Sequence, residues 1–300
     1  MMRSLAVAFV VVVAETTIVN FAQVPQQAPP TFRAGADAVT IEVSVRDRAK
    51  PILGLGPADF LVSDDGVPQT VATVSYGVKP IDVTVVLDVS LSVTGQMLDR
   101  LRRAVRQLMT DRGPEDRLKL ILFNSRVLRV VDFTTDANAV DEAIRTATAG
   151  GGSSILDALS VATVAASDPD RRHLVMIFTD ASDSSSVLTP EVVARVVERT
   201  TSAVSAVVTL RNFFTSSNAP GSGTALLQLL ARNSGGVYLP ILRASQDLTG
   251  PFKQALDEFR STYVLHYTPA GVPAGGFHSL TVSVRGRNGL TVKARRGYFR

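Results

Sequence analysis

The sequence predicts an α/β fold: a doubly wound, mostly parallel sheet that is inserted in, or flanked by, a small β-sandwich built from N- and C-terminal strands. Two apolar runs, one opening Ile81–Val93 and one at His173–Thr179, are typical of fully buried strands. Segments with apolar residues at helical spacing alternate with the strands between and after them. Near both ends of the chain, strands instead alternate apolar and polar residues, as half-buried antiparallel strands do.

The α/β part is expected over residues 80–260. Each connection there is long enough to return the chain for a parallel strand. The helices expected from 3.6-residue periodicity are Gln96–Met109, Asp136–Ala147, Ile155–Ala166, Pro190–Thr200, Thr224–Arg232 and Leu248–Phe259. The remaining strands are expected at Leu118–Phe123, Val127–Phe133, Ala203–Leu210 and Val237–Ile241.

Short strands with close turn signals make up residues 37–79 and 261–300. The expected strands are Val39–Val45, Asp59–Ser63, Gln69–Val74, Ser261–Tyr267, Ser279–Val284 and Thr291–Ala294. Hairpin turns are expected at residues 64–66 and 287–289, where Asp-Gly and Asn-Gly pairs occur. Because each group of strands alone is too small to be stable, we expect one β-sandwich; two separate β extensions are the alternative.

The first residues carry the pattern of a secretory signal. A short basic start precedes Leu5–Ala14, an uncharged apolar run that is too short to span a bilayer comfortably. A signal peptide is expected over residues 1–22, with cleavage after Ala14 or Ala22, followed by a flexible lead-in over residues 23–36. This predicts a secreted, periplasmic or cell-envelope protein with no stable membrane span after cleavage. A retained anchor and a buried N-terminal strand are the alternatives.

Composition narrows the possible functions. The chain of 300 residues is 45% hydrophobic and 19% charged, which suits a folded protein with a real core. It contains no cysteine, which excludes disulfides, thiol catalysis and cysteine-bound zinc. The net charge of +4 is dispersed, so no nucleic-acid partner is expected.

Oxygen-bearing side chains follow the buried strands. Asp88, Ser90 and Ser92 end the first strand, Ser153 follows a glycine run, and Asp180 ends the strand at 173–179. These loops should meet at the carboxyl edge of a parallel sheet, where such sheets bind ligands. Hydroxyl and carboxylate oxygens favour Mg²⁺ or Mn²⁺, with Ca²⁺ less well suited.

The three segments resemble the metal-ion-dependent adhesion site (MIDAS) of the von Willebrand factor type A (VWA) domain. That pattern is Asp-x-Ser-x-Ser, a Thr after a glycine pair, and Thr-Asp or Ser-Asp after a buried strand. It corresponds here to Asp88–Ser92, Gly151–Ser154 and Phe178–Asp183. The flanking segments 31–33, 55–60, 64–69, 263–269 and 296–298 are similar to the secreted VWFA-related proteins of Acidobacteria-type bacteria.

The resemblance implies roles for the site residues. Ser90 and Ser92 would bind the metal directly, Ser153 would replace the usual threonine, and Asp88 and Asp180 would act largely through water. The sequence departs from the pattern in having serine at 153, with a second hydroxyl at Ser154. It also has leucine at 91, where glycine is often found.

These roles predict a protein-binding or adhesion module rather than an enzyme. Mainly neutral ligands would leave the cation most of its charge, so an Asp or Glu carboxylate of a partner protein could complete the site. The resemblance also implies coupling to the helix at 248–259. The alternatives are a structural or scaffold VWA protein with a weak or vestigial site, and a Mg²⁺-dependent phosphatase-like hydrolase using Asp88. The sequence contains no G-x-S-x-G, G-x-x-x-x-G-K or H-E-x-x-H motif.

Other polar residues have structural explanations. The three histidines are expected at strand ends and on the surface, and Asp157 as a structural acid. Asp183 is expected in solvent, and a supporting role behind the metal ligands is the alternative. The arginines of residues 99–106 are expected to form a solvated helix face, and the basic residues of 285–300 a solvated β edge.

Overall fold

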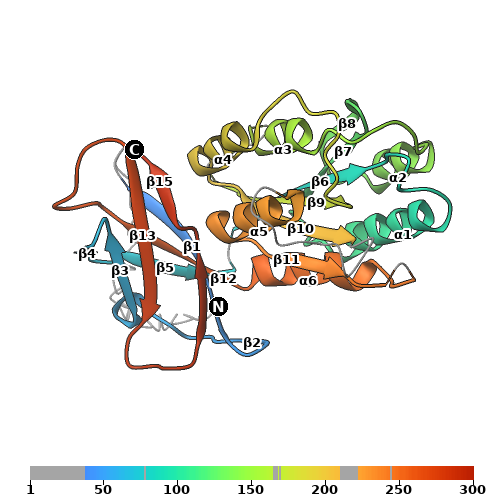
Figure 1. Ribbon diagram of the computed structural model, residues 1–300. Helices are drawn as coiled ribbons and strands as arrows, with labels where there is room; N and C mark the ends of the chain where they lie inside the picture. Colours follow the sequence, from blue (N-terminus) through green and yellow to red (C-terminus); the bar gives the residue numbers. More distant parts are fainter. Residues whose placement is uncertain (1–37, 78, 165–167, 169, 210–221, 244) are drawn as a thin grey trace, which may run out of the picture. The chain divides into compact units, whose positions relative to one another are not determined.

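The computed structural model describes residues 38–300, except 78, 165–167, 169, 210–221 and 244 (Figure 1). The predicted signal peptide and lead-in lie outside the described residues. Among the residues that are described, no helix is both long and apolar enough to cross a membrane.

A six-stranded sheet forms the α/β part, in the order β11-β10-β9-β6-β7-β8. Its strands are β6 (Ile81–Asp88), β7 (Arg117–Phe123), β8 (Val127–Thr134), β9 (Arg172–Thr179), β10 (Ala203–Thr209) and β11 (Tyr238–Ile241). All neighbours are parallel except β7 and β8. The two apolar runs predicted as buried strands are β6 and β9, which pair at the centre and are buried at every residue. The predicted α/β fold with a mostly parallel sheet is therefore confirmed.

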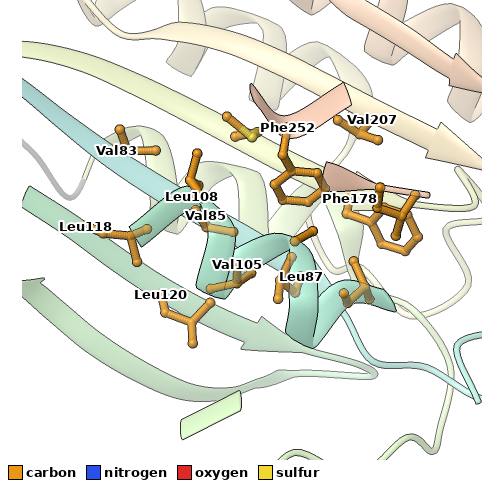
Figure 2. Packing of buried hydrophobic residues seen from close by; sticks show 14 of the residues in the cluster. Val83, Val85, Leu87, Val105, Leu108, Leu118, Leu120, Phe178, Val207 and Phe252 are labelled. Atoms are coloured by element: carbon orange, nitrogen blue, oxygen red, sulfur yellow. The ribbon is translucent and has the colours of Figure 1, made fainter. Parts of the chain in front are cut away.

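Helices cover both faces of this sheet (Figure 1). One face packs against α1 (Gln96–Asp111), α2 (Ala137–Arg145) and α6 (Thr249–Arg260). The other face packs against α3 (Ile155–Val164), α4 (Pro190–Arg199) and α5 (Gly223–Ser234). Figure 2 shows the first core, in which Val85 and Leu87 of β6 lie against Val105 of α1. Burying a side chain of this size contributes about 1.5–3 kcal/mol. The two hydrophobic cores, one on each face of the sheet, therefore hold β6 and β9 in place.

The remaining strands form two antiparallel sheets, which we call the terminal β module. One sheet has the order β14-β1-β12-β5, with β2 paired to β1, and the other has the order β15-β13-β3-β4. The first contains β1 (Val39–Asp47), β2 (Lys50–Pro51), β5 (Thr73–Tyr76), β12 (Thr262–Tyr267) and β14 (Thr291–Ala294). The second contains β3 (Phe60–Asp64), β4 (Val67–Gln69), β13 (Phe277–Val284) and β15 (Gly297–Phe299). N-terminal strands pair with C-terminal strands in both sheets, and the sheets contribute to one hydrophobic core.

Two local predictions in this module are wrong. Residues 69–74 are not one strand, because β4 ends at Gln69 and β5 begins at Thr73 in the other sheet. Residues 287–289 do not join a hairpin, because β13 pairs with β3 and β15 whereas β14 pairs with β1. Alternation identifies a strand but not its partner, so the sequence could not show that the chain crosses between sheets at these points.

Arg172, the first residue of β9, connects the module to the α/β part. Its side chain is 4% exposed, and its Nε donates to Glu42 Oε1 of β1 at 2.7 Å. Its Nη2 donates to the Phe259 carbonyl at 2.6 Å and also to the Thr262 hydroxyl. One guanidinium therefore joins β9, β1, the end of α6 and the start of β12.

Candidate metal-binding site

The predicted loops meet at the carboxyl edge of the central sheet. Backbone hydrogen bonds join the loop after β6 to β7 and to the glycine loop before α3. Val89 N donates to Phe123 O at 2.8 Å, Gly150 N to Val89 O at 2.9 Å, and Leu91 N to Gly151 O at 3.1 Å. These bonds fix the backbones that present the serines.

Asp88 is the buried hydrogen-bond acceptor of the site. It has no exposed surface, and its Oδ1 accepts from Ser90 N at 2.9 Å. Its Oδ2 accepts from Ser153 Oγ at 2.6 Å and from Thr179 Oγ1 at 2.7 Å. A buried carboxylate needs such partners, and here they come from the loop after β6, the glycine loop and the end of β9.

The other four predicted residues line an open pocket of about 380 Å³. These are Ser90, Ser92, Ser153 and Asp180, and the remaining lining residues are Leu91, Gly151, Gly152, Ser182 and Ser184. The hydroxyl oxygens of Ser90 and Ser92 are 3.0 Å apart. Asp180 Oδ1 accepts from Ser182 N at 3.0 Å. The structure thus brings together residues that are up to 92 positions apart in the sequence, Asp88 and Asp180.

The glycine loop places the Ser153 hydroxyl. Gly151 has φ of +74°, which favours glycine. A Cβ on Gly152 would lie 2.5 Å from Ser185 Oγ and 2.6 Å from Ser184 Oγ. Ser153 N donates to Ser184 Oγ at 3.0 Å, and its carbonyl accepts from the amides of Ser184 and Ser185 at 2.9 and 3.0 Å. The backbone of Ser153 is therefore held on both sides.

The donor set fits a hard divalent cation. Two oxygens that are adjacent ligands of Mg²⁺, each about 2.1 Å from the ion, lie about 3 Å apart in an octahedron. The Ser90–Ser92 oxygen separation of 3.0 Å matches that spacing. Because Ser153 gives its hydroxyl proton to Asp88, the lone pairs of its oxygen remain available to a metal.

Thr179 was not among the predicted site residues. Its hydroxyl donates to Asp88 and accepts from Ala181 N at 3.1 Å, yet Thr179 does not line the pocket. Its place next to Asp180 in the Thr-Asp pair was the available signal. Ser154 instead donates to Asn124 O at 2.8 Å, so Ser153 is the hydroxyl of this pair that lines the pocket.

Asp183 is exposed, as predicted, but it also makes structural contacts. Its Oδ2 accepts from Leu156 N at 3.1 Å and from Ser186 Oγ at 2.6 Å, so it caps the start of α3. Asp157 is a structural acid as expected, accepting from the backbone amides of Val187 and Leu188. The loop after β9 is thereby fastened to α3, next to the pocket.

Arg102 does not belong to a fully solvated helix face. Its guanidinium donates to the carbonyls of Ile144, Arg145 and Ala147 at the end of α2. These carbonyls lie in the last turn of α2 or just after it, where a cation is favourable. Arg295 likewise donates to the carbonyls of Glu198 and Thr200 instead of forming a solvated edge, and burial lowers the pKa of its guanidinium.

Two of the three histidines are buried, contrary to expectation. His173 Nε2 lies 2.8 Å from Thr84 Oγ1 and its Nδ1 lies 2.7 Å from Ser202 Oγ. Burial lowers the pKa of His173 to about 4. The hydroxyl partners explain how an imidazole is tolerated at the start of a buried strand.

His278, the other buried histidine, belongs to a carboxylate cluster in the terminal β module. With Asp64 and Asp65 it forms a group of possible metal donors within 4.8 Å of one another, identified among the described residues. The oxygens of Asp64 already interact with His278 Nδ1 at 3.0 Å and accept from the hydroxyls of Tyr267 and Tyr298 at 2.7 and 2.8 Å. Asp64 is therefore an internal hydrogen-bonding centre that joins β3 to β12, β13 and β15.

Comparisons with known proteins agree with this fold. Residues 83–182 match the family model of the von Willebrand factor type A domain, and no curated protein matches the chain. A von Willebrand factor type A structure from Catenulispora acidiphila is 12% identical, with 87% of this chain and 72% of that chain covered and a TM-score of 0.51. An aerotolerance-related membrane protein from Bacteroides fragilis is 14% identical (60% and 98% covered, TM-score 0.46). Proximal thread matrix protein 1 from the mussel byssus, with a zinc-occupied MIDAS motif, is also 14% identical (65% and 48% covered, TM-score 0.48). The chain therefore contains a von Willebrand factor type A domain.

Proposed function

We propose that this protein is a metal-dependent protein-binding module whose VWA domain holds Mg²⁺, or Mn²⁺ or Ca²⁺, and uses it to bind an acidic residue of a partner. The observation that carries the proposal is the hydroxyl cluster of Ser90, Ser92 and Ser153 around one pocket. The apolar run Leu5–Ala14 supports a secreted, periplasmic or cell-envelope location.

The residues of the chain divide into ligands and supports. Ser90, Ser92 and Ser153 would hold the cation through their hydroxyl oxygens. Asp88 orients the Ser153 hydroxyl and accepts from the amide of Ser90, while Asp180 adds a carboxylate at the rim. The bound ion would supply positive charge at an open coordination position, which suits a partner carboxylate.

The same geometry favours binding over catalysis. A nucleophilic serine needs a base within hydrogen-bond reach, and none of the described residues lining the pocket is a histidine. A phosphoryl-accepting aspartate must reach its substrate, but Asp88 has no exposed surface and accepts three hydrogen bonds. We therefore propose a non-catalytic role.

Calorimetric titration with Mg²⁺ or Mn²⁺ tests the metal site. The wild type should bind one ion, whereas Asp88→Ala should bind it at least tenfold more weakly. Ser92→Ala is the milder variant, because its hydroxyl accepts from no backbone amide among the described contacts. Absence of binding to the wild type, or equal binding by all three proteins, would contradict the proposal.

Capture of partners from the native cell envelope tests the protein-binding role. The set of proteins captured with Mg²⁺ present should be lost in EDTA and in the Asp88→Ala variant. Capture that ignores EDTA would instead favour a scaffold protein with a vestigial metal site.

A further inference from the structure

Leu91 is the large apolar residue of the candidate site. It is 69% exposed and lines the pocket between Ser90 and Ser92, the two proposed ligands. An isolated exposed leucine on a protein surface needs no explanation. Leu91 differs because it is exposed within the lining of the same pocket as the proposed ligands.

The backbone on both sides of Leu91 is fixed. Its own amide donates to Gly151 O at 3.1 Å, and the amide of Ser90 donates to Asp88 at 2.9 Å. Val93 N donates to Ser90 O at 2.9 Å, and the Val93 side chain is buried. These bonds fix the backbone at Leu91, and its exposed side chain lines the pocket.

The rest of the pocket offers a partner little else. Apart from Leu91, the lining residues that the structure describes are serines, glycines and Asp180. This lining contains no lysine or arginine, so a second acidic group on the partner would gain no ion pair and would be repelled by Asp180. An apolar side chain could bury surface against Leu91.

We infer that the partner of this site presents an aliphatic or aromatic side chain directly beside the carboxylate that completes the metal site. The inference rests on the proposed function and adds the class of partner sequence. Coordination of the carboxylate fixes the partner next to Leu91, so the apolar contact forms without ordering another part of the chain. Leu91 is then a specificity-determining residue that does not bind the metal.

The test uses the full chain in saturating Mg²⁺ and four blocked tetrapeptides. Two contain Leu-Asp or Asp-Leu between glycines, and two contain Ser-Asp or Asp-Ser. For wild type, at least one leucine peptide should bind about fivefold more tightly than its serine counterpart, measured by competition or NMR titration. Leu91→Ser should reduce this ratio to about one, and Leu91→Met should preserve most of it.

Val187→Ser provides the matched control. Val187 is 88% exposed and belongs to the loop after β9, but it does not line the pocket. This variant should leave the peptide ratio unchanged, and all three variants should bind Mg²⁺ as the wild type does. A ratio near one in wild type, with Mg²⁺-dependent binding of all four peptides, would overturn the inference while leaving the proposed function intact. Absence of Mg²⁺ binding by wild type would overturn both.

Discussion

Two hydroxyls donate to the same oxygen of Asp88, and only one of them lines the pocket. Ser153 and Thr179 are both buried and lie 2.6 and 2.7 Å from Asp88 Oδ2. Ser153→Ala and Thr179→Val each remove one of these hydrogen bonds. We expect both variants to be destabilised, but only Ser153→Ala to lose the metal.

The expected losses of stability follow from the contacts. A hydrogen bond to a charged group contributes about 2 kcal/mol, so Ser153→Ala should cost about that much. Thr179→Val should cost about 3 kcal/mol, because it also leaves the Ala181 amide without the Thr179 hydroxyl that accepts from it. Mg²⁺ at ten times its Kd should stabilise wild type and Thr179→Val by about 1.4 kcal/mol.

Urea denaturation in EDTA and again in Mg²⁺ separates the two effects. The EDTA series measures the hydrogen bonds, and the difference between the two series measures metal binding to the folded protein. An unchanged Mg²⁺ increment in Ser153→Ala would refute its role as a ligand. Loss of the increment in both variants would show that the metal depends on the orientation of Asp88 rather than on the Ser153 oxygen.

Three further predictions concern the start of β9 and the glycine loop before α3. The pKa of His173 near 4 lies below its usual 6.5, so the unfolded chain binds the proton first as pH falls. The free energy of unfolding should therefore be independent of His173 ionisation above about pH 6.5 and should fall by about 3 kcal/mol as the pH is lowered to 4. In urea titrations, His173→Gln should remove this pH-dependent loss. Arg172→Met should destabilise the protein by about 3–5 kcal/mol in urea because it leaves Glu42 without its partner. Gly152→Ala should weaken Mg²⁺ binding in calorimetry about tenfold, since its Cβ would displace the adjacent serine hydroxyls.

The central sheet was predictable because its strands carry strong signals of their own. β6 and β9 are uninterrupted apolar runs, and only a sheet covered on both faces buries such runs. Because both strands were expected in one parallel sheet, the placement of Asp88 and Asp180 at the same carboxyl edge followed from geometry. The Ser153 position depended on the resemblance, because a glycine run alone does not indicate which loop it contacts.

The remaining contacts could not be predicted because they depend on tertiary partners. His173 at a strand start gives no sign that Thr84 and Ser202 will surround its ring. Asp183 resembles a loop residue until the start of α3 is placed against it. In the terminal β module, alternation predicted strands but left their pairing open, and the chain ends pair across more than 200 residues.

Serine at 153 raises the question of whether the hydroxyl is held firmly enough to bind a metal. A threonine has a stiffer χ1 because of its methyl group, and a serine must obtain that restraint from its surroundings. Here Ser153 is 3% exposed, its backbone amide and carbonyl are both hydrogen-bonded to the 184–185 segment, and its hydroxyl donates to Asp88. The rotamer that donates to Asp88 is therefore already selected in the metal-free protein, so binding costs little additional side-chain entropy. Restraint by Asp88 and by residues 184–185 thus replaces the missing methyl. We therefore expect Ser153→Thr to change Mg²⁺ affinity in calorimetry by less than about threefold, whereas a large gain in affinity would show that the Ser153 side chain is mobile.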